Sequence, residues 1–147
     1  MAAEFVHLHA HSQYSLLDGA LKIKDLVSRT KSLGMRAVAL TDHGNMFGAI
    51  QLYKTCKEHG VQAILGCEVN VARRGSDRSD ERLGEAVDHL VLLASSEEGY
   101  KNLVRIVSRG HVEPASQLAP SVTLDTVAEY KAGIIGLTGC MGGSFWR

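Results

Sequence analysis

Apolar runs that alternate with amphipathic segments constrain the fold of this chain more than any other feature. The runs are short and bounded by glycine or polar residues, which predicts β-strands over residues 36–41, 61–72, 87–94 and 133–138. Apolar residues recur at helical spacing elsewhere, which predicts helices over 23–33, 47–59, 95–110 and 123–130. Strands separated by helices favour an α/β fold with a mostly parallel sheet, either doubly wound or closed into a barrel.

Composition excludes several classes of function. The chain has 147 residues, which fits one domain, and 16 Lys and Arg residues balance 16 Asp and Glu residues. A protein that binds nucleic acid by bulk electrostatics would show a clear basic excess. No apolar run approaches the roughly 18 residues of a membrane span, and we expect no secretory signal at the N-terminus. Three cysteines without a short-range pairing pattern favour a reducing cytoplasm.

Histidine is the residue type that stands out, because three of the seven histidines fall within residues 7–11. Residues 5–11 alternate strictly, which predicts one further strand with its imidazoles on one face and its apolar side chains on the other. Residues two apart on a strand point the same way, so His9 and His11 can bind one metal ion or adjacent ions. The spacing alone is a weak signal, and two histidines lining a polar strand face would explain it as well.

Candidate ligands stand at or after the ends of several predicted strands, where parallel α/β folds collect their functional groups. Imidazoles, carboxylates and thiolates are ligands of first-row metals. The residues at these strand ends are His9, His11, Asp18, His43, Glu68 and Cys140. Their number favours a metal site. Asp42 could orient the imidazole of His43 or cap the helix that follows, and His7 would support the site from behind.

Several of these residues also have purely structural interpretations. Glu68 could be an ordinary exposed residue at a strand end, and a lone Cys140 would more often be a buried apolar residue. His89 lies near the start of its predicted strand, the wrong end for such a site, which favours a satisfied strand histidine. Cys56 and Cys67 are expected in the core. The remaining histidines are expected to be incidental: His59 ends a helix and His111 lies in a loop.

Longer stretches resemble a known family. They are residues 7–19 (HLHAHSQYSLLDG), 39–49 (ALTDHGNMFGA), 66–69 (GCEV), 88–94 (DHLVLLA), 98–104 (EGYKNLV) and 137–143 (LTGCMGG). Together they resemble the PHP (polymerase and histidinol phosphatase) domain, in the form found at the N-terminus of bacterial replicative DNA polymerase III alpha subunits. The resemblance covers nearly the whole chain. It implies a partial PHP metal-binding domain over residues 1–143, followed by an atypical end over 144–147.

The family implies a fold and a ligand set. The expected fold is an incomplete, distorted (β/α)7 barrel with mostly parallel strands, around a cluster of up to three Zn, Mn or Fe ions. The ligands carried over by motif are His9, His11, Asp18, His43, Glu68, His89 and Cys140. His7 and Asp42 are expected behind them, with no catalytic residue beyond the ligands. The family's further Asp-x-His pair is absent, because no Asp or His follows Cys140, and we expect the chain to be a truncated piece.

Three functions remain open. The first is 3′→5′ exonuclease activity, used in proofreading by a replicative DNA polymerase, in which bound metal would activate water for attack on a phosphodiester. The second is a metal-stabilised structural domain on which a separate proofreading subunit docks. The third is a free-standing PHP phosphatase. The first two imply a cytoplasmic nucleotidyltransferase that acts on DNA with the sliding clamp, the clamp loader and the proofreading subunit, and no membrane partner.

Overall fold

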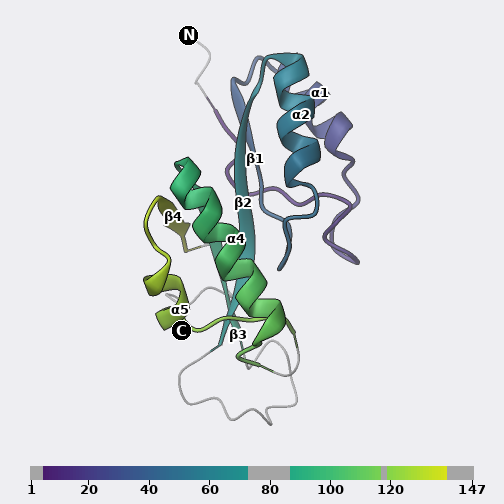
Figure 1. Ribbon diagram of the computed structural model, residues 1–147. Coiled ribbons are helices and arrows are strands. Elements are labelled where there is room, and N and C mark those ends of the chain that lie inside the picture. Colours follow the sequence, from purple (N-terminus) through teal and green to yellow (C-terminus); the bar gives the residue numbers. More distant parts are fainter. Residues whose placement is uncertain (1–4, 73–86, 117–118, 139–147) are drawn as a thin grey trace.

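The computed structural model describes residues 5–72, 87–116 and 119–138. Four strands form one sheet in the order β1-β2-β3-β4 (Figure 1). The strands are β1 (Ala37–Leu40), β2 (Gln62–Ala72), β3 (Val87–Ala94) and β4 (Ile134–Leu137). The helices are α1 (Ile23–Ser32), α2 (Ala49–His59), α4 (Glu97–Val112) and α5 (Leu124–Glu129). The fold is mixed α/β, as the sequence predicts.

The expectation of a mostly parallel sheet is wrong. β1 and β2 pair in parallel, but β2 pairs with β3 and β3 with β4 in antiparallel register. Short apolar runs indicate buried strands, but strand direction depends on long-range pairing, which a local pattern does not encode. The β3–β4 pair is antiparallel even though α4 and α5 lie between its strands.

The strand predicted over residues 5–11 is also wrong in extent. The segment runs beside β1 and forms only an isolated parallel bridge, from His7 to Val38, with a second contact from Thr41 N–H to the Ala10 carbonyl at 2.8 Å. Of its apolar side chains, Leu8 is exposed, and Val6 and Ala10 are only partly buried. Alternation of side chains therefore reflects an extended edge segment here and not a full strand.

Helix boundaries follow the local signals in the sequence. Gly60 ends α2 in the left-handed conformation, with φ of 69°. The hydroxyl of Ser96 caps α4 by accepting the N–H of Gly99 at 3.0 Å, and Thr123 caps α5 in the same way. α4 continues to Val112, so the sequence prediction for His111 was wrong: the residue lies in the last helical turn and not in a loop.

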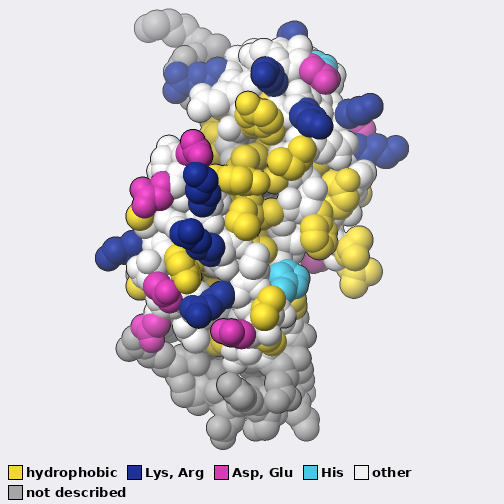
Figure 2. Space-filling model, in the orientation of Figure 1, with side chains coloured by type: hydrophobic (Ala, Val, Ile, Leu, Met, Phe, Trp, Pro, Cys, Tyr) yellow, Lys and Arg dark blue, Asp and Glu magenta, His cyan; other side chains and the backbone are white. Residues whose placement is uncertain are grey.

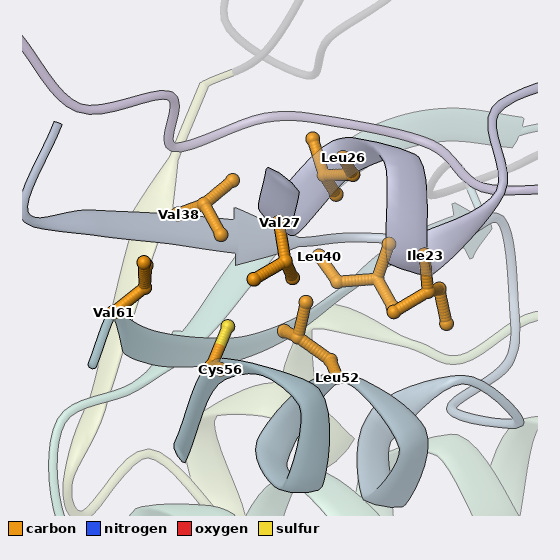
Figure 3. Packing of buried hydrophobic residues seen from close by; sticks show 8 residues of the cluster. All are labelled: Ile23, Leu26, Val27, Val38, Leu40, Leu52, Cys56 and Val61. Carbon is orange, nitrogen blue, oxygen red and sulfur yellow. The ribbon is translucent and has the colours of Figure 1, made fainter. Parts of the chain in front are cut away.

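The helices cover one face of the sheet. The first hydrophobic cluster joins α1, β1 and α2 and includes Val27, Leu52 and the buried Cys56 (Figure 3). The second joins β2 and β3 to α4 through residues such as Cys67, Leu92 and Ile106. Both cysteines are therefore core residues, as expected.

The side chains that alternate with these core residues along each strand point to the opposite face of the sheet. A third, smaller cluster lies there, formed by Ala39, Val91 and Leu93 with the partly buried Ile64. Glu68 lies on the same face of the sheet as Ile64, because the two are an even number of residues apart on β2. The candidate site is therefore on the face away from α4.

Hydrophobic side chains also gather at the surface between α2 and α4 (Figure 2). The exposed hydrophobic residues of these helices and the loop before α2 include Phe47, Ile50, Tyr53 and Val104. Among the described residues, no helix has the length and apolar character needed to cross a membrane.

Candidate metal centre

Glu68 forms the centre of the candidate site. It stands on β2, only 3% exposed, in a strand whose pairing on both sides fixes its position. Gly66 lets the neighbouring chain approach there, since a Cβ at this position would meet the Leu92 carbonyl oxygen at 2.7 Å and the Thr41 side chain at 2.8 Å. A buried carboxylate needs partners, and imidazoles supply them.

Three donor atoms converge at this centre. His9 Nε2 lies 2.6 Å and His11 Nε2 3.0 Å from Glu68 Oε2, and the two imidazole nitrogens lie 2.8 Å from each other. Two imidazoles and a carboxylate at this separation match the donor set of a first-row metal ion. The residues present therefore fit a divalent cation, and His9 and His11 share a face as their spacing predicts.

The other carboxylate oxygen faces two more histidines. His89 Nδ1 lies 2.8 Å and His43 Nδ1 3.7 Å from Glu68 Oε1. The imidazoles form a continuous row, with the His11 and His43 rings 4.0 Å apart between centroids and the His43 and His89 rings 5.9 Å apart. Asp18 lies at the rim, with its side chain 69% exposed and Oδ2 3.8 Å from His43 Nε2.

The antiparallel register explains why His89 joins the site. Residue 89 pairs with Asn70 near the end of β2, so the start of β3 lies beside the end of β2. The start of β3, which the sequence analysis took to be the wrong end for a metal site, therefore lies at the site. Six of the seven carried-over ligands lie in the part of the chain that the structure describes. Four of them are the histidines around Glu68, and Asp18 joins the group through His43. Cys140 falls outside the described residues.

The charges in the cluster are strongly coupled. Burial raises the pKa of Glu68, but hydrogen bonds from His89 and His9 and the positive charge of His43 outweigh it and lower this pKa to about 2. The hydrogen bond to Glu68 raises the pKa of His89. Burial and the neighbouring His43 lower the pKa of His11. The neutral imidazole that a metal ligand requires is thus favoured at His11.

Asp42 braces the loop that carries the first ligands. Its carboxylate is 1% exposed and accepts the Ser12 N–H at 2.6 Å, the Ser12 hydroxyl at 2.8 Å and the Ser15 hydroxyl at 2.7 Å. The helix-cap interpretation of Asp42 is wrong, because α2 begins at Ala49 after Gly48. Its carboxylate instead ties the loop of His9 and His11 to the end of β1.

In the interactions described, His7 contacts Phe5 and the backbone of β1 and not a ligand residue. Its exposed ring packs edge-on against Phe5, with the centroids 4.8 Å apart, and its carbonyl accepts the Ala39 N–H at 2.8 Å. Sequence reasoning missed Ser12, Ser15 and Asn45, all buried in the loops around the ligands. Their signal was a polar residue type inside a motif, which is common in solvated loops and identifies no partner.

Comparison with known proteins shows the family of the chain. The family model of the PHP domain matches residues 7–147. DNA polymerase III subunit alpha of Treponema pallidum is 46% identical over 140 residues, which are 95% of this chain and 12% of that protein. The Thermus aquaticus subunit is 42% identical over 145 residues, again 95% of this chain and 12% of the relative. The chain thus spans about an eighth of the length of these curated relatives.

A solved structure shares the fold. It is a protein from Bifidobacterium adolescentis provisionally described as a metal-dependent phosphoesterase, with a TM-score of 0.50 and 16% sequence identity. The match covers 88% of this chain and 51% of that one. The family model spans every helix and strand that the structure describes and all six of the described ligand positions. The chain therefore belongs to the PHP domain family.

Proposed function

We propose that this chain is the PHP portion of a replicative DNA polymerase III alpha subunit and that its site hydrolyses phosphodiesters at 3′ ends with divalent metal ions. The observation that carries the proposal is the single buried carboxylate of Glu68 with four imidazoles around it. The polymerase relatives at 40–46% identity support the assignment to the longer protein.

The residues that would hold the metal are His9, His11 and Glu68 at one carboxylate oxygen, and His43, His89 and the rim residue Asp18 beyond it. Cys140 is proposed as a further ligand on its motif alone. Divalent ions bound there would supply a more acidic water and positive charge for phosphate oxygens. Zn, Mn and Fe all suit imidazole and carboxylate donors, in a cluster of up to three ions in the complete domain.

The chain's own residues hold these donors in place. Glu68 stays ionised over the physiological range because His89 and His9 donate to it. Asp42 holds the Ser12–Ser15 turn, so that His9 and His11 stay on the same side as Glu68. Asp18 is the most exposed member, at 69%, and is therefore the donor best placed to meet a substrate entering from solvent.

The longer protein is proposed to act as a DNA-directed DNA polymerase in the cytoplasm, with the sliding clamp, clamp loader and proofreading subunit as partners. Its PHP domain is proposed to be a distorted (β/α)7 barrel of which the described sheet is a part. The antiparallel pairs β2–β3 and β3–β4 would be the source of its distortion from a regular parallel barrel.

One experiment tests the activity. Asp18→Asn, made in the full-length polymerase, should reduce excision of a mismatched 3′ nucleotide by at least about tenfold, because it removes a ligand charge. Asp25→Asn is the matched control, since Asp25 is an exposed residue in the first turn of α1. Unchanged excision by the Asp18 variant would overturn the exonuclease proposal.

A second candidate function is a metal-stabilised structural domain. It is favoured by the origin of the ligands, which come from four separate segments: the loop before α1, the loop after β1, strand β2 and strand β3. Bound metal would cross-link these segments and stabilise the fold. In this case Asp18→Asn would lower the thermal stability of the metal-loaded protein and leave excision unchanged.

A further inference from the structure

His111 connects the helical layer to the loop that carries a metal ligand. It lies in the last turn of α4, on the opposite side of the sheet from Glu68. Its Nε2 donates to the Gly44 carbonyl at 2.7 Å, across 67 residues of sequence. α4 descends in front of the sheet, so its last turn lies at the end toward which β2 runs (Figure 1). Gly44 directly follows the ligand His43.

The backbone groups of this turn can be accounted for in full. The His43 N–H donates to the Ser15 hydroxyl at 3.1 Å, and the His43 carbonyl accepts from Asn45 Nδ2 at 2.9 Å. The Gly44 N–H donates to the Glu68 carbonyl at 2.8 Å. These loop and strand contacts do not include the Gly44 carbonyl. His111 supplies the hydrogen-bond donor for it.

The conformation of Gly44 makes that last contact matter. Its φ is +61°, in the left-handed region that side chains rarely adopt, while a Cβ would find open space there. Conformation, and not crowding, is therefore what glycine provides. A glycine peptide has many alternative orientations, and a hydrogen bond at each end of it selects one.

Other contacts between the loop and α4 are looser. His111 lines an open groove between the two together with Met46, Phe47 and Val107. Met46 packs partly against the cluster under α4, whereas Phe47 is 72% exposed. The polar contact from His111 is thus the directional link between the helical layer and the His43–Gly44 turn.

We infer that His111 is a positioning residue: it fixes the Gly44 peptide and thereby holds the His43 imidazole against Glu68, which raises the affinity of the site for a divalent cation. Ligand orientation by a second layer of hydrogen bonds is a general feature of metal sites. The inference rests on the proposed metal site. It assigns a role to the histidine that the sequence analysis treated as incidental.

The test uses Mn²⁺ alone as the probe, titrated calorimetrically into the metal-free chain. His111→Ala should weaken Mn²⁺ binding about three- to tenfold, the range for one solvent-accessible hydrogen bond. His111→Gln keeps an N–H donor and should restore affinity to within about twofold of the wild type. His59→Ala is the matched control, because His59 Nδ1 bonds the Thr55 carbonyl within α2, away from the site.

A second measurement separates positioning from general stability. In the metal-free chain, His111→Ala should accelerate hydrogen exchange at the Gly44 amide while the core amides of β2 exchange as in the wild type. If the wild type fails to bind Mn²⁺, the proposed metal site falls and this inference falls with it. If the wild type binds and His111→Ala binds equally well, or Gln fails to restore binding, only the role of His111 is overturned.

Discussion

His9 Nε2 lies 2.6 Å from Glu68 Oε2, although 59 residues separate the two along the chain. The contact exists because the segment before α1 runs beside β1 and β1 runs beside β2. A carboxylate that is 3% exposed thus receives an imidazole from a segment that is not itself a regular strand. The geometry of the site therefore depends on the pairing of the sheet, and changes at Glu68 should affect both binding and folding.

Mn²⁺ should stabilise the chain, and Glu68→Gln should remove most of that effect. At a hundredfold excess over the dissociation constant, a ligand that binds only the folded state adds about 2.7 kcal/mol to the free energy of unfolding. Thermal unfolding with Mn²⁺ and with a chelator measures the difference. Glu68 is the residue to change because it contacts His9, His11 and His89.

Glu58→Gln is the control for this experiment, since Glu58 is exposed on α2. It should keep the full Mn²⁺-dependent increase in melting temperature. An increase of equal size in the Glu68 variant would show that the ion binds elsewhere.

Several of the proposed ligand positions follow from local sequence patterns, whereas the position of His89 does not. His9 and His11 follow from the period of two along an extended segment, and His43 follows from the break after an apolar run. His89 stands near the start of β3, and its place beside Glu68 requires the antiparallel register with β2. Strand direction depends on long-range pairing, which a local pattern does not encode.

The interactions that support the ligands could not be predicted from the sequence either. Ser12 and Ser15 are ordinary loop residues by composition, and only the tertiary contact with Asp42 makes them buried partners of a carboxylate. The predicted strand over residues 5–11 failed for a related reason. Alternation indicates extended backbone, whereas a strand also needs a continuous ladder of hydrogen bonds, and this segment makes only isolated ones with β1.

Asp42→Ala should destabilise the chain by about 3 kcal/mol or more. The change leaves the Ser12 N–H and the hydroxyls of Ser12 and Ser15 buried without their acceptor. Urea unfolding measures the loss. Asp25→Ala, at an exposed position of α1, should stay within about 1 kcal/mol of the wild type. Equal losses of unfolding free energy in the two variants would contradict the stabilising role of the Asp42 hydrogen bonds.

Leu52→Ala should cost about 2 to 5 kcal/mol, the range for emptying a well-packed core position. Leu52 is 0% exposed, and its side chain points from α2 into the first cluster (Figure 3). Ile50→Ala is the matched control on the same helix, since Ile50 is 56% exposed and should change stability by no more than about 0.5 kcal/mol. Chemical denaturation of both variants tests whether the cluster holds α2 in place.

In the metal-free chain, Glu68 should give a distinct acid dependence of stability. Its pKa is about 2 in the folded state against an ordinary 4.5, so its contribution is complete above pH 4.5 and is lost as the pH falls toward 2. A shift of this size corresponds to about 3 kcal/mol. The wild type should therefore lose about that much more stability than Glu68→Gln across this window, as measured by urea unfolding in the presence of a chelator.

The alkaline side of the same profile has the opposite sign. The pKa of His89 is raised by its hydrogen bond to Glu68, so the stability from this pair is complete below the ordinary value of 6.5 and is lost as the pH rises through the raised pKa. The difference between the wild type and Glu68→Gln should thus be largest between about pH 4.5 and 6.5. His89→Asn should remove the alkaline decline and keep part of the acid one, because His9 still donates to Glu68. A flat difference across the whole range would contradict the ionised cluster around Glu68.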